Sequence, residues 1–306
     1  MIMNTIKKYF FLASSAMMMF SCETGINPTL EIAEPVYGVD AWINNKPEAQ
    51  VIVLTKSQPY FDNTLPSGIS GATVKVTDEK GFVYTFLEDN AKRGTYVWTP
   101  NSNEAFGKIG FSYQLDIQVG GETLKATSKM GRVPVIDSVT YYTEKRLGTE
   151  DVVTFGQFWA TDPAGPHDSY WIRTYKNGAL LGKPSEINIA YDAGASSGGL
   201  TDGVTFIQPI RQGINSSDKD TSEKRMNPIA SGDSLNVQIH SITLSAFDHL
   251  YGVKIQTDRP GGFAELFATP LANVSTNIIN ANEKGTKTQG FFNVAAVSSS
   301  GKRFKD

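Results

Sequence analysis

The sequence is poor in the residues that build disulfides and transition-metal sites. Its 306 residues include one cysteine and three histidines. A single cysteine excludes an internal disulfide, and the chain has no paired C-x-x-C and no H-E-x-x-H motif, so we do not expect a zinc enzyme. The thiol of Cys22 is therefore free for another use.

Long apolar runs are equally scarce, and the one that stands out lies near the start of the chain. A pair of lysines precedes residues 9–21 (YFFLASSAMMMFS). A run of this length is too short to span a bilayer but is typical of a signal-peptide core. It ends at a small residue directly before Cys22. This order predicts a lipoprotein signal peptide over residues 1–21 and lipid attachment to Cys22, which tethers the protein to a membrane.

The residues at the cleavage point match neither export signal completely. Met19-Phe20-Ser21 is not the A-x-A-like site of a soluble secreted protein. It is also a degenerate lipobox, because Met19 and Phe20 stand where Leu and a small residue are usual. The cysteine that follows decides the prediction in favour of lipidation.

Charge of one sign is not concentrated in this chain. Lys and Arg number 28 against 31 Asp and Glu, a formal net charge of −3. Nucleic-acid binding depends on clustered Lys and Arg that neutralise phosphates, so we do not expect it. No later segment approaches transmembrane length, and we expect the lipid to be the only membrane attachment.

Short alternating runs separated by turns predict a mainly β protein. After a lipid-proximal spacer at residues 22–35, about seven short strands occur within residues 36–131, with hairpin turns at Asp78–Gly81 and at Gly120-Gly121. That spacing is typical of an immunoglobulin-like sandwich. Pro134 interrupts the pattern, which predicts a domain boundary there.

Residues 135–306 are predicted to form a second β-rich domain. Asn177-Gly178 is its strongest hairpin signal, and residues 291–298 are predicted to close the fold as a buried strand. Between residues 244 and 251 apolar side chains recur every three or four positions, which predicts one short helix. Two long polar loops, residues 193–203 and 213–232, have the composition of binding or mobile segments.

Four segments carry a resemblance to a known family. They are residues 51–61 (VIVLTKSQPYF), 70–78 (SGATVKVTD), 272–278 (ANVSTNI) and 290–292 (GFF). The chain resembles domain of unknown function 4249, a family typical of Bacteroidota outer membranes, over nearly all of its length after the signal. The resemblance implies a lipoprotein found beside TonB-dependent transporters, on either face of the outer membrane. No catalytic residues are established for the family, so none is carried over.

Aromatic side chains are the best candidates for ligand contact. Phe158-Trp159 and Tyr170-Trp171 are adjacent pairs in two predicted strands. Aromatic faces stack on sugars and other flat ligands, and we take Trp159, Tyr170 and Trp171 as tentative ligand-binding residues. Strand alternation nevertheless predicts that one residue of each pair points into the core.

Catalytic and metal chemistry have little support in the sequence. The segment DPAGPHD makes Asp162 and Asp168 weak calcium candidates, but Asp and Gly in a turn more often serve backbone geometry. No G-x-S-x-G motif is present, and we interpret His240 and His249 as structural or solvated. We therefore predict no metal, no cofactor and no catalytic residue.

Together these features predict a non-enzymatic lipoprotein of the outer membrane, accessory to a TonB-dependent transporter through ligand capture or as a lid. A structural or adhesive surface module is the alternative. A glycan hydrolase is a third hypothesis, and it requires two carboxylates that converge in a concave, aromatic-lined pocket.

Overall fold

The computed structural model describes residues 33–59, 62, 64–101, 104–145, 152–196, 198–215 and 226–305. The chain divides into two units, residues 1–34 and 35–306, and the fold described below is that of the second. The predicted signal peptide and Cys22 lie outside the described residues. Within the described part, no helix is long and apolar enough to cross a membrane.

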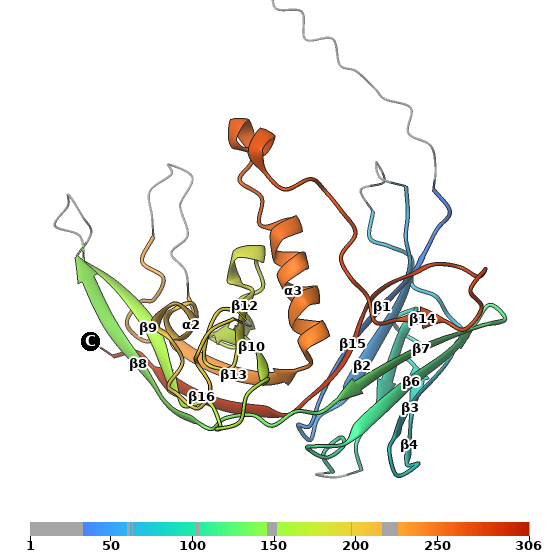
Figure 1. Ribbon diagram of the computed structural model, residues 1–306, viewed down its shortest axis with the longest axis horizontal. Helices are drawn as coiled ribbons and strands as arrows, with labels where there is room; N and C mark the ends of the chain where they lie inside the picture. The colour runs from blue at the N-terminus through green and yellow to red at the C-terminus, as the bar shows by residue number, and fades with distance from the viewer. Residues whose placement is uncertain are drawn as a thin grey trace, which may run out of the picture. The chain divides into compact units, whose positions relative to one another are not determined.

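The fold is mainly β, as the sequence predicts, and its larger sheet has nine strands (Figure 1). The strand order is β14-β7-β6-β3-β4-β5-β2-β1-β15. The bounds are β1 (Tyr37–Asn44), β2 (Gln50–Lys56), β3 (Thr73–Asp78), β4 (Val83–Glu88), β5 (Thr95–Trp98), β6 (Ser112–Val119), β7 (Glu122–Lys129), β14 (Ile279–Asn280) and β15 (Thr288–Ala295). We call this the first sheet.

Both hairpins predicted in this region are present. β3 pairs with β4, and in the turn between them the Asp78 carboxylate accepts hydrogen bonds from the backbone N–H groups of Lys80 and Phe82 at 2.9 Å. β6 pairs with β7 across Gly120 and Gly121, both of which have positive φ. A turn with two left-handed residues matches the twist of the strands, which is why two glycines serve here.

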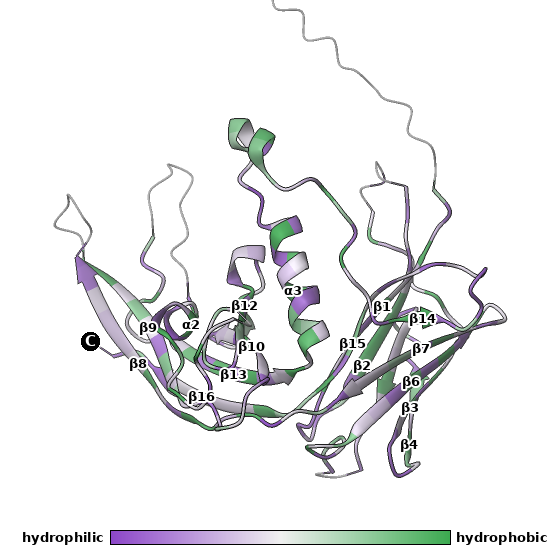
Figure 2. Ribbon diagram, viewed as in Figure 1, coloured by the Kyte–Doolittle hydropathy of each residue, from purple (hydrophilic) through white to green (hydrophobic). Residues whose placement is uncertain are grey.

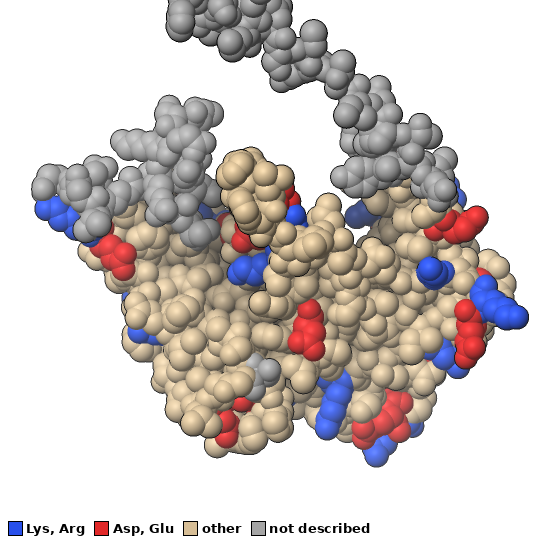
Figure 3. Space-filling model, turned by 45° about the horizontal axis from the view of Figure 1, so that its top comes forward, with Lys and Arg blue, Asp and Glu red and all other residues tan. Residues whose placement is uncertain are grey.

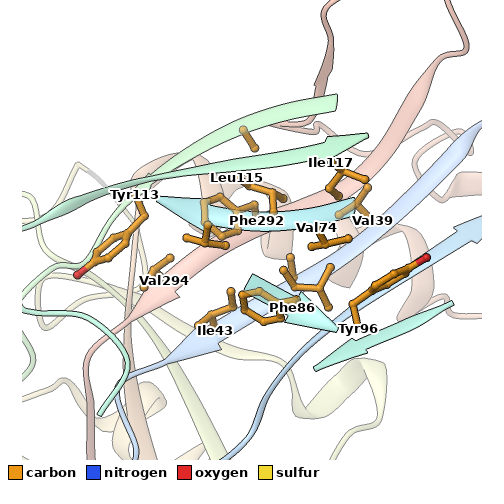
Figure 4. Packing of buried hydrophobic residues seen from close by; sticks show 14 of the residues in the cluster. Val39, Ile43, Val74, Phe86, Tyr96, Tyr113, Leu115, Ile117, Phe292 and Val294 are labelled. Atoms are coloured by element: carbon orange, nitrogen blue, oxygen red, sulfur yellow. The ribbon is translucent and has the colours of Figure 1, made fainter. Parts of the chain in front are cut away.

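The core of the first sheet is contributed by strands along the whole path, as Figure 4 shows for Val39, Val74, Leu115 and Phe292. β4 pairs with both β3 and β5 and so connects the two halves of the path. Side chains from both halves share one apolar cluster, an arrangement consistent with the predicted sandwich.

Two late strands, β14 and β15, return to the first sheet, which the sequence pattern did not indicate. β15 pairs in parallel with β1, from Tyr37↔Thr288 to Asn44↔Ala295, and β14 pairs with β7. Phe292 packs in the core of the first sheet, whereas its neighbour Phe291 faces a different cluster. Residues 279–295, predicted as part of the second domain, thus complete the first sheet.

The remaining strands form a five-stranded sheet, the second sheet, and a separate two-stranded ribbon (Figure 1). The order is β11-β10-β13-β16, with β12 also paired to β10, and β8 pairs with β9. The bounds are β8 (Ile136–Lys145), β9 (Val152–Ala160), β10 (Ser169–Lys176), β11 (Ala179–Leu180), β12 (Asn188–Tyr191), β13 (Ser234–Ile242) and β16 (Val297–Arg303). The predicted hairpin at Asn177-Gly178 joins β10 to β11.

The predicted helix is α3 (Leu244–Thr257), which continues beyond Gly252. Its N-cap is Thr243, whose hydroxyl accepts a hydrogen bond from the backbone N–H of Ala246 at 3.2 Å. Gly252 permits close packing, because a Cβ there would lie 2.8 Å from Cγ1 of Val274. Three short helical segments were not predicted: α2 (Gln208–Gln212), η1 (Pro184–Glu186) and η2 (Gly262–Phe267).

Candidate functional site

The structure separates the three aromatic residues proposed as ligand contacts. Tyr170 is fully buried, and its hydroxyl donates a hydrogen bond to Oδ1 of Asp162 at 2.6 Å. Its ring cannot stack on a ligand at the surface, so the interpretation of Tyr170 as a ligand contact is wrong. The alternation argument is confirmed, since Phe158 is also fully buried while Trp159 and Trp171 are partly exposed.

Both tryptophans already contact protein cations. The guanidinium of Arg211 lies 4.1 Å from the ring centroid of Trp159, and that of Arg173 lies 4.7 Å from Trp171. Trp171 also packs edge-on against Trp42, with centroids 5.1 Å apart. Trp159 belongs to the two-stranded ribbon and Trp171 to the second sheet, so they do not form one aromatic platform.

The structure instead brings together three aspartates. Oxygen atoms of Asp162, Asp168 and Asp192 lie within 4.8 Å of one another. Asp162 follows β9, Asp168 precedes β10 and Asp192 follows β12. β10 and β12 are antiparallel neighbours with Ser169 opposite Tyr191, which places Asp168 beside Asp192. The pairing of strand ends, invisible in the sequence, creates this cluster.

Two of these carboxylates are almost fully buried, and they fix neighbouring loops by accepting hydrogen bonds from backbone N–H groups. Asp162 is 2% exposed and Asp192 is 3% exposed. Oδ2 of Asp162 accepts a hydrogen bond from the N–H of Gly203 at 3.1 Å. Oδ1 of Asp192 accepts hydrogen bonds from the N–H groups of His167 and Asp168, both at 2.9 Å. The carboxylates therefore order the residues between β9 and β10 and the loop after β12.

Arg132 supplies the positive charge at this cluster. It lies between β7 and β8, and its Nε donates a hydrogen bond to Oδ2 of Asp168 at 2.7 Å. Its Nη1 donates to the carbonyl of Ala164 at 2.8 Å, and its Nη2 donates to the carbonyls of Pro163 and Gly165. One guanidinium thus clamps the whole turn between β9 and β10.

The electrostatics of the cluster follow from burial and from like charge. Burial raises the pKa of Asp162, against hydrogen bonds from Tyr170 and Gly203 that lower it, and the neighbouring aspartates raise it further. Burial also raises the pKa of Asp168, although Arg132 acts in the opposite direction. Three carboxylates share one guanidinium, so the site favours any added cation or proton.

The cluster has the oxygen chemistry that calcium prefers. The sequence offered Asp162 and Asp168 as weak calcium candidates, and the structure places them together with a third carboxylate, that of Asp192. Asp192 was missed; its φ of 47° and the Asp-Ala-Gly turn that follows β12 are the signals that mark it in retrospect. Arg132, two residues before the predicted boundary at Pro134, was also missed.

A cleft lies beside the cluster and has a volume of about 460 Å³. Its lining combines polar groups from Lys129, Arg132, Asp168 and Ser169 with apolar ones from Ile109, Ile242 and Leu244. Residues of the first sheet region and the second sheet therefore face the same space. Among the described residues that line the cleft, Ser169 has a buried Oγ with no hydrogen-bond partner.

The cleft does not have the features that glycoside hydrolysis requires. Its lining includes one carboxylate, Asp168, and no Trp, Tyr or Phe of the described chain. The neighbouring carboxylate of Asp162 is buried, does not line the cleft and accepts a hydrogen bond from Tyr170. The converging pair of acids in an aromatic pocket, which the hydrolase hypothesis needs, is not found in this cleft.

The three histidines have structural partners. The ring of His167 bonds the hydroxyl of Tyr191, the buried ring of His240 bonds Gln238 at 3.1 Å, and Nδ1 of His249 bonds the carbonyl of Ser275. Within the described ranges, no histidine bonds a serine, threonine or cysteine side chain. The described chain thus contains no hydrogen-bonded pair of the Ser–His or Cys–His type.

The two long loops are only partly described. In the first, residues 193–203, the carbonyl of Thr201 accepts a hydrogen bond from the N–H of Ala193, and Asp202 accepts one from the N–H of Gly165 at 2.8 Å. That loop is therefore tied to the turn that Arg132 clamps. Of the second, residues 213–232, positions 216–225 lie outside the described residues.

The family described as domain of unknown function (DUF4249) matches residues 23–300, which is most of the chain. No curated protein matches the sequence.

Proposed function

Because the chain belongs to the DUF4249 family, we propose that it is a lipid-anchored, non-enzymatic lipoprotein of the outer membrane that captures a ligand for a TonB-dependent transporter. The observation that carries the ligand-capture part is the cleft of about 460 Å³ beside Arg132. Concave sites with an apolar wall and a few convergent polar groups are the usual form of small-molecule sites.

The lining of the cleft defines the chemistry of its ligand. Lys129 offers a positive charge at the lining, whereas the guanidinium of Arg132 is already paired with Asp168. Ile109, Ile242 and Leu244 form the apolar part of the lining. A small molecule that combines an apolar portion with an anionic or strongly accepting group satisfies both parts.

The membrane anchor rests on the N-terminal sequence. Cys22 follows a short apolar run preceded by lysines, the order that a lipoprotein signal requires. Metabolic labelling with a radioactive fatty acid tests it directly. We expect label on the wild-type protein and none on Cys22→Ser, which should leave the membrane fraction. Equal labelling of both proteins would disprove anchoring at Cys22.

The cleft is tested by native mass spectrometry of protein purified from the producing cells. We expect a bound small-molecule mass on the wild-type protein and its loss from Lys129→Glu, which reverses a charge at the cleft. The matched control is Lys125→Glu, an exposed lysine four positions earlier on the same strand that does not line the cleft. Loss of the adduct from both variants, or from neither, would argue against this cleft.

The transporter partner is tested by affinity purification through a C-terminal tag from membranes in mild detergent. A stoichiometric TonB-dependent transporter is the expected product. An outer-membrane protein that purifies without a transporter would instead favour the structural or adhesive alternative. The Lys129→Glu variant separates ligand from partner, because it should lose the ligand and keep the transporter.

A further inference from the structure

The segment between α3 and β14 exposes a cluster of large apolar side chains. Phe263, Leu266, Phe267 and Leu271 are 78%, 75%, 79% and 67% exposed. We call these four residues the apolar tip; the first three belong to η2, which is largely green in Figure 2. Single exposed apolar residues are ordinary, but a cluster of this size marks a surface that docks on something.

The apolar tip carries no uncompensated charge. Between residues 259 and 271 the charged residues are Arg259 and Glu265, and they form an ion pair with each other. Nη1 of Arg259 also donates a hydrogen bond to the carbonyl of Thr269 at 2.6 Å, which closes the segment into a loop. In Figure 3 the projecting surface around η2 is mostly tan. Its partner is therefore recognised by apolar contact rather than by charge.

The apolar tip lies at the end of the body from which the chain leads back to Cys22. α3 has 14 residues and is therefore about 21 Å long, and Figure 1 shows η2 beyond its C-terminal end. The start of β1 lies toward the same end of the body in Figure 1. The tip and the origin of the tether thus face the same direction.

The length of the tether limits how far this end can lie from the membrane. A fully extended chain spans at most about 3.5 Å per residue, so the segment from Cys22 to Ala33 reaches at most about 40 Å. If Cys22 carries lipid, Ala33, where the described body begins, is kept within that distance of the bilayer. The surface that the tip meets most often is then the membrane itself.

We propose that the apolar tip inserts into the interface of the bilayer to which Cys22 is anchored. This inference rests on the anchoring part of the proposed function. Phenylalanine and leucine enter the boundary between headgroups and acyl chains, and burial there removes their exposed area from water. The lipid on Cys22 and the apolar tip then contact the membrane at two points, and two points of contact orient the folded part of the chain and its cleft relative to the bilayer.

The proposal is tested with the whole mature chain carrying Cys22→Ser, so that no lipid contributes to binding. Flotation with phosphatidylcholine vesicles measures association. We expect binding to these neutral vesicles that does not weaken with added salt, because the tip is uncharged. Phe263→Ser/Phe267→Ser should reduce the partition coefficient at least about tenfold, given what burial of one such side chain contributes.

The matched control removes two exposed apolar residues elsewhere. Leu87 is 70% exposed and Leu200 is 103% exposed, and Leu87→Ser/Leu200→Ser should bind vesicles like the parent. A Phe267→Trp reporter should show a blue-shifted emission only when vesicles are added. Circular dichroism and thermal melting establish that each variant is folded before its partition coefficient is compared.

Three outcomes would overturn the proposal: no association of the folded parent with neutral vesicles, association only with anionic vesicles and its loss in salt, or equal losses in the tip and control variants. A tip that cross-links to a protein in cells and ignores vesicles would likewise replace the membrane with a protein partner. Fatty-acid labelling of Cys22 is scored separately, so failure of the anchor and failure of the tip are distinguishable.

Discussion

The first and second sheets both enclose apolar clusters, but they differ in the polar side chains that are buried beside those clusters. The first sheet encloses one large apolar cluster that includes Val39, Leu115 and Phe292. Most of the buried polar side chains occur after Pro134, among them Asp162, Asp192 and His240. Apolar burial is non-directional and tolerates variation, whereas buried polar groups must each find a partner. The part of the chain after Pro134, which we call the polar region, is therefore better suited to form a binding site.

The largest effect is expected from the apolar core of the first sheet. Phe292→Ala removes a fully buried ring from a strand that arrives from the far end of the chain. We expect a loss of about 4 kcal/mol in the free energy of unfolding, from lost transfer energy and the cavity left behind. Urea denaturation measures it. Phe82→Ala, at a ring that is 54% exposed, should cost about 0.5 kcal/mol. Similar losses for Phe292→Ala and Phe82→Ala would mean that burial in the core of the first sheet does not contribute to stability as expected.

The second largest loss in the free energy of unfolding is expected from replacing Gly290, the glycine that allows β15 to approach β1. Gly290 has φ of 94°, and a Cβ there would lie 2.0 Å from the carbonyl oxygen of Val39. Gly290→Ala should cost about 3 kcal/mol through strain and overlap.

Gly178 in the second sheet is the matched position for this test. It has φ of 84°, and nothing lies within 4 Å of its added Cβ. Gly178→Ala should therefore cost only the conformational strain, about 1 kcal/mol. Thermal melts of both variants compare the two sites, and equal shifts would refute close contact between β1 and β15.

Arg132 tests the polar region. Arg132→Met removes the charge that Asp168 pairs with, and we expect a loss of about 2 kcal/mol. The loss should shrink as pH falls and Asp168 becomes neutral. Adding Asp168→Asn should restore part of the stability, a coupling that a double-mutant cycle measures. Purely additive losses would contradict it.

An exposed ion pair in the first sheet region provides the comparison for Arg132. Lys46 and Glu48 are 3.1 Å apart, with side chains 34% and 48% exposed. Lys46→Met should change stability by about 0.5 kcal/mol or less, because solvent screens such pairs. A cost as large as that of Arg132→Met would remove the distinction between the two regions.

The last expected effect is a pH dependence from His240. Burial, with help from Arg173 and Lys46, lowers the pKa of His240 to about 3. The folded-state pKa of His240 lies below the unfolded value of 6.5, so the contribution of the neutral ring to the free energy of unfolding is complete above pH 6.5. This contribution should be lost at about 1 kcal/mol per pH unit as the pH falls below 6.5.

His240→Gln should flatten this slope in urea titrations between about pH 7 and about pH 4. The raised pKa values of Asp162 and Asp168 act in the opposite direction, because their protonated forms are favoured in the folded state. The wild-type protein and the His240→Gln variant both contain these aspartates, so the difference between their two pH slopes reports on His240 alone. Identical slopes would show that His240 does not contribute.

The sequence predicted what depends on local pattern. Alternation and turn glycines located the hairpins at residues 78–81, 120–121 and 177–178, and a three-to-four spacing located α3. The return of β15 to β1 was not predictable, because a buried apolar strand carries no mark of its partner. Asp162, Asp168 and Asp192 come together only when strand ends meet, so the sequence offered two of them and missed the third.

The return of β15 also sets the order in which the chain can fold. Val297 donates a hydrogen bond to Asn45 across 252 residues of sequence, and β1 acquires its parallel neighbour only from residues near the C-terminus. Pairings of such separation form slowly because loop closure precedes any gain. A chain that is synthesised or exported from its N-terminus thus leaves the edge of β1 unpaired until β15 is available, and an unpaired edge is a template for aggregation. The arrival of β15 therefore ends the period in which β1 can pair with another chain.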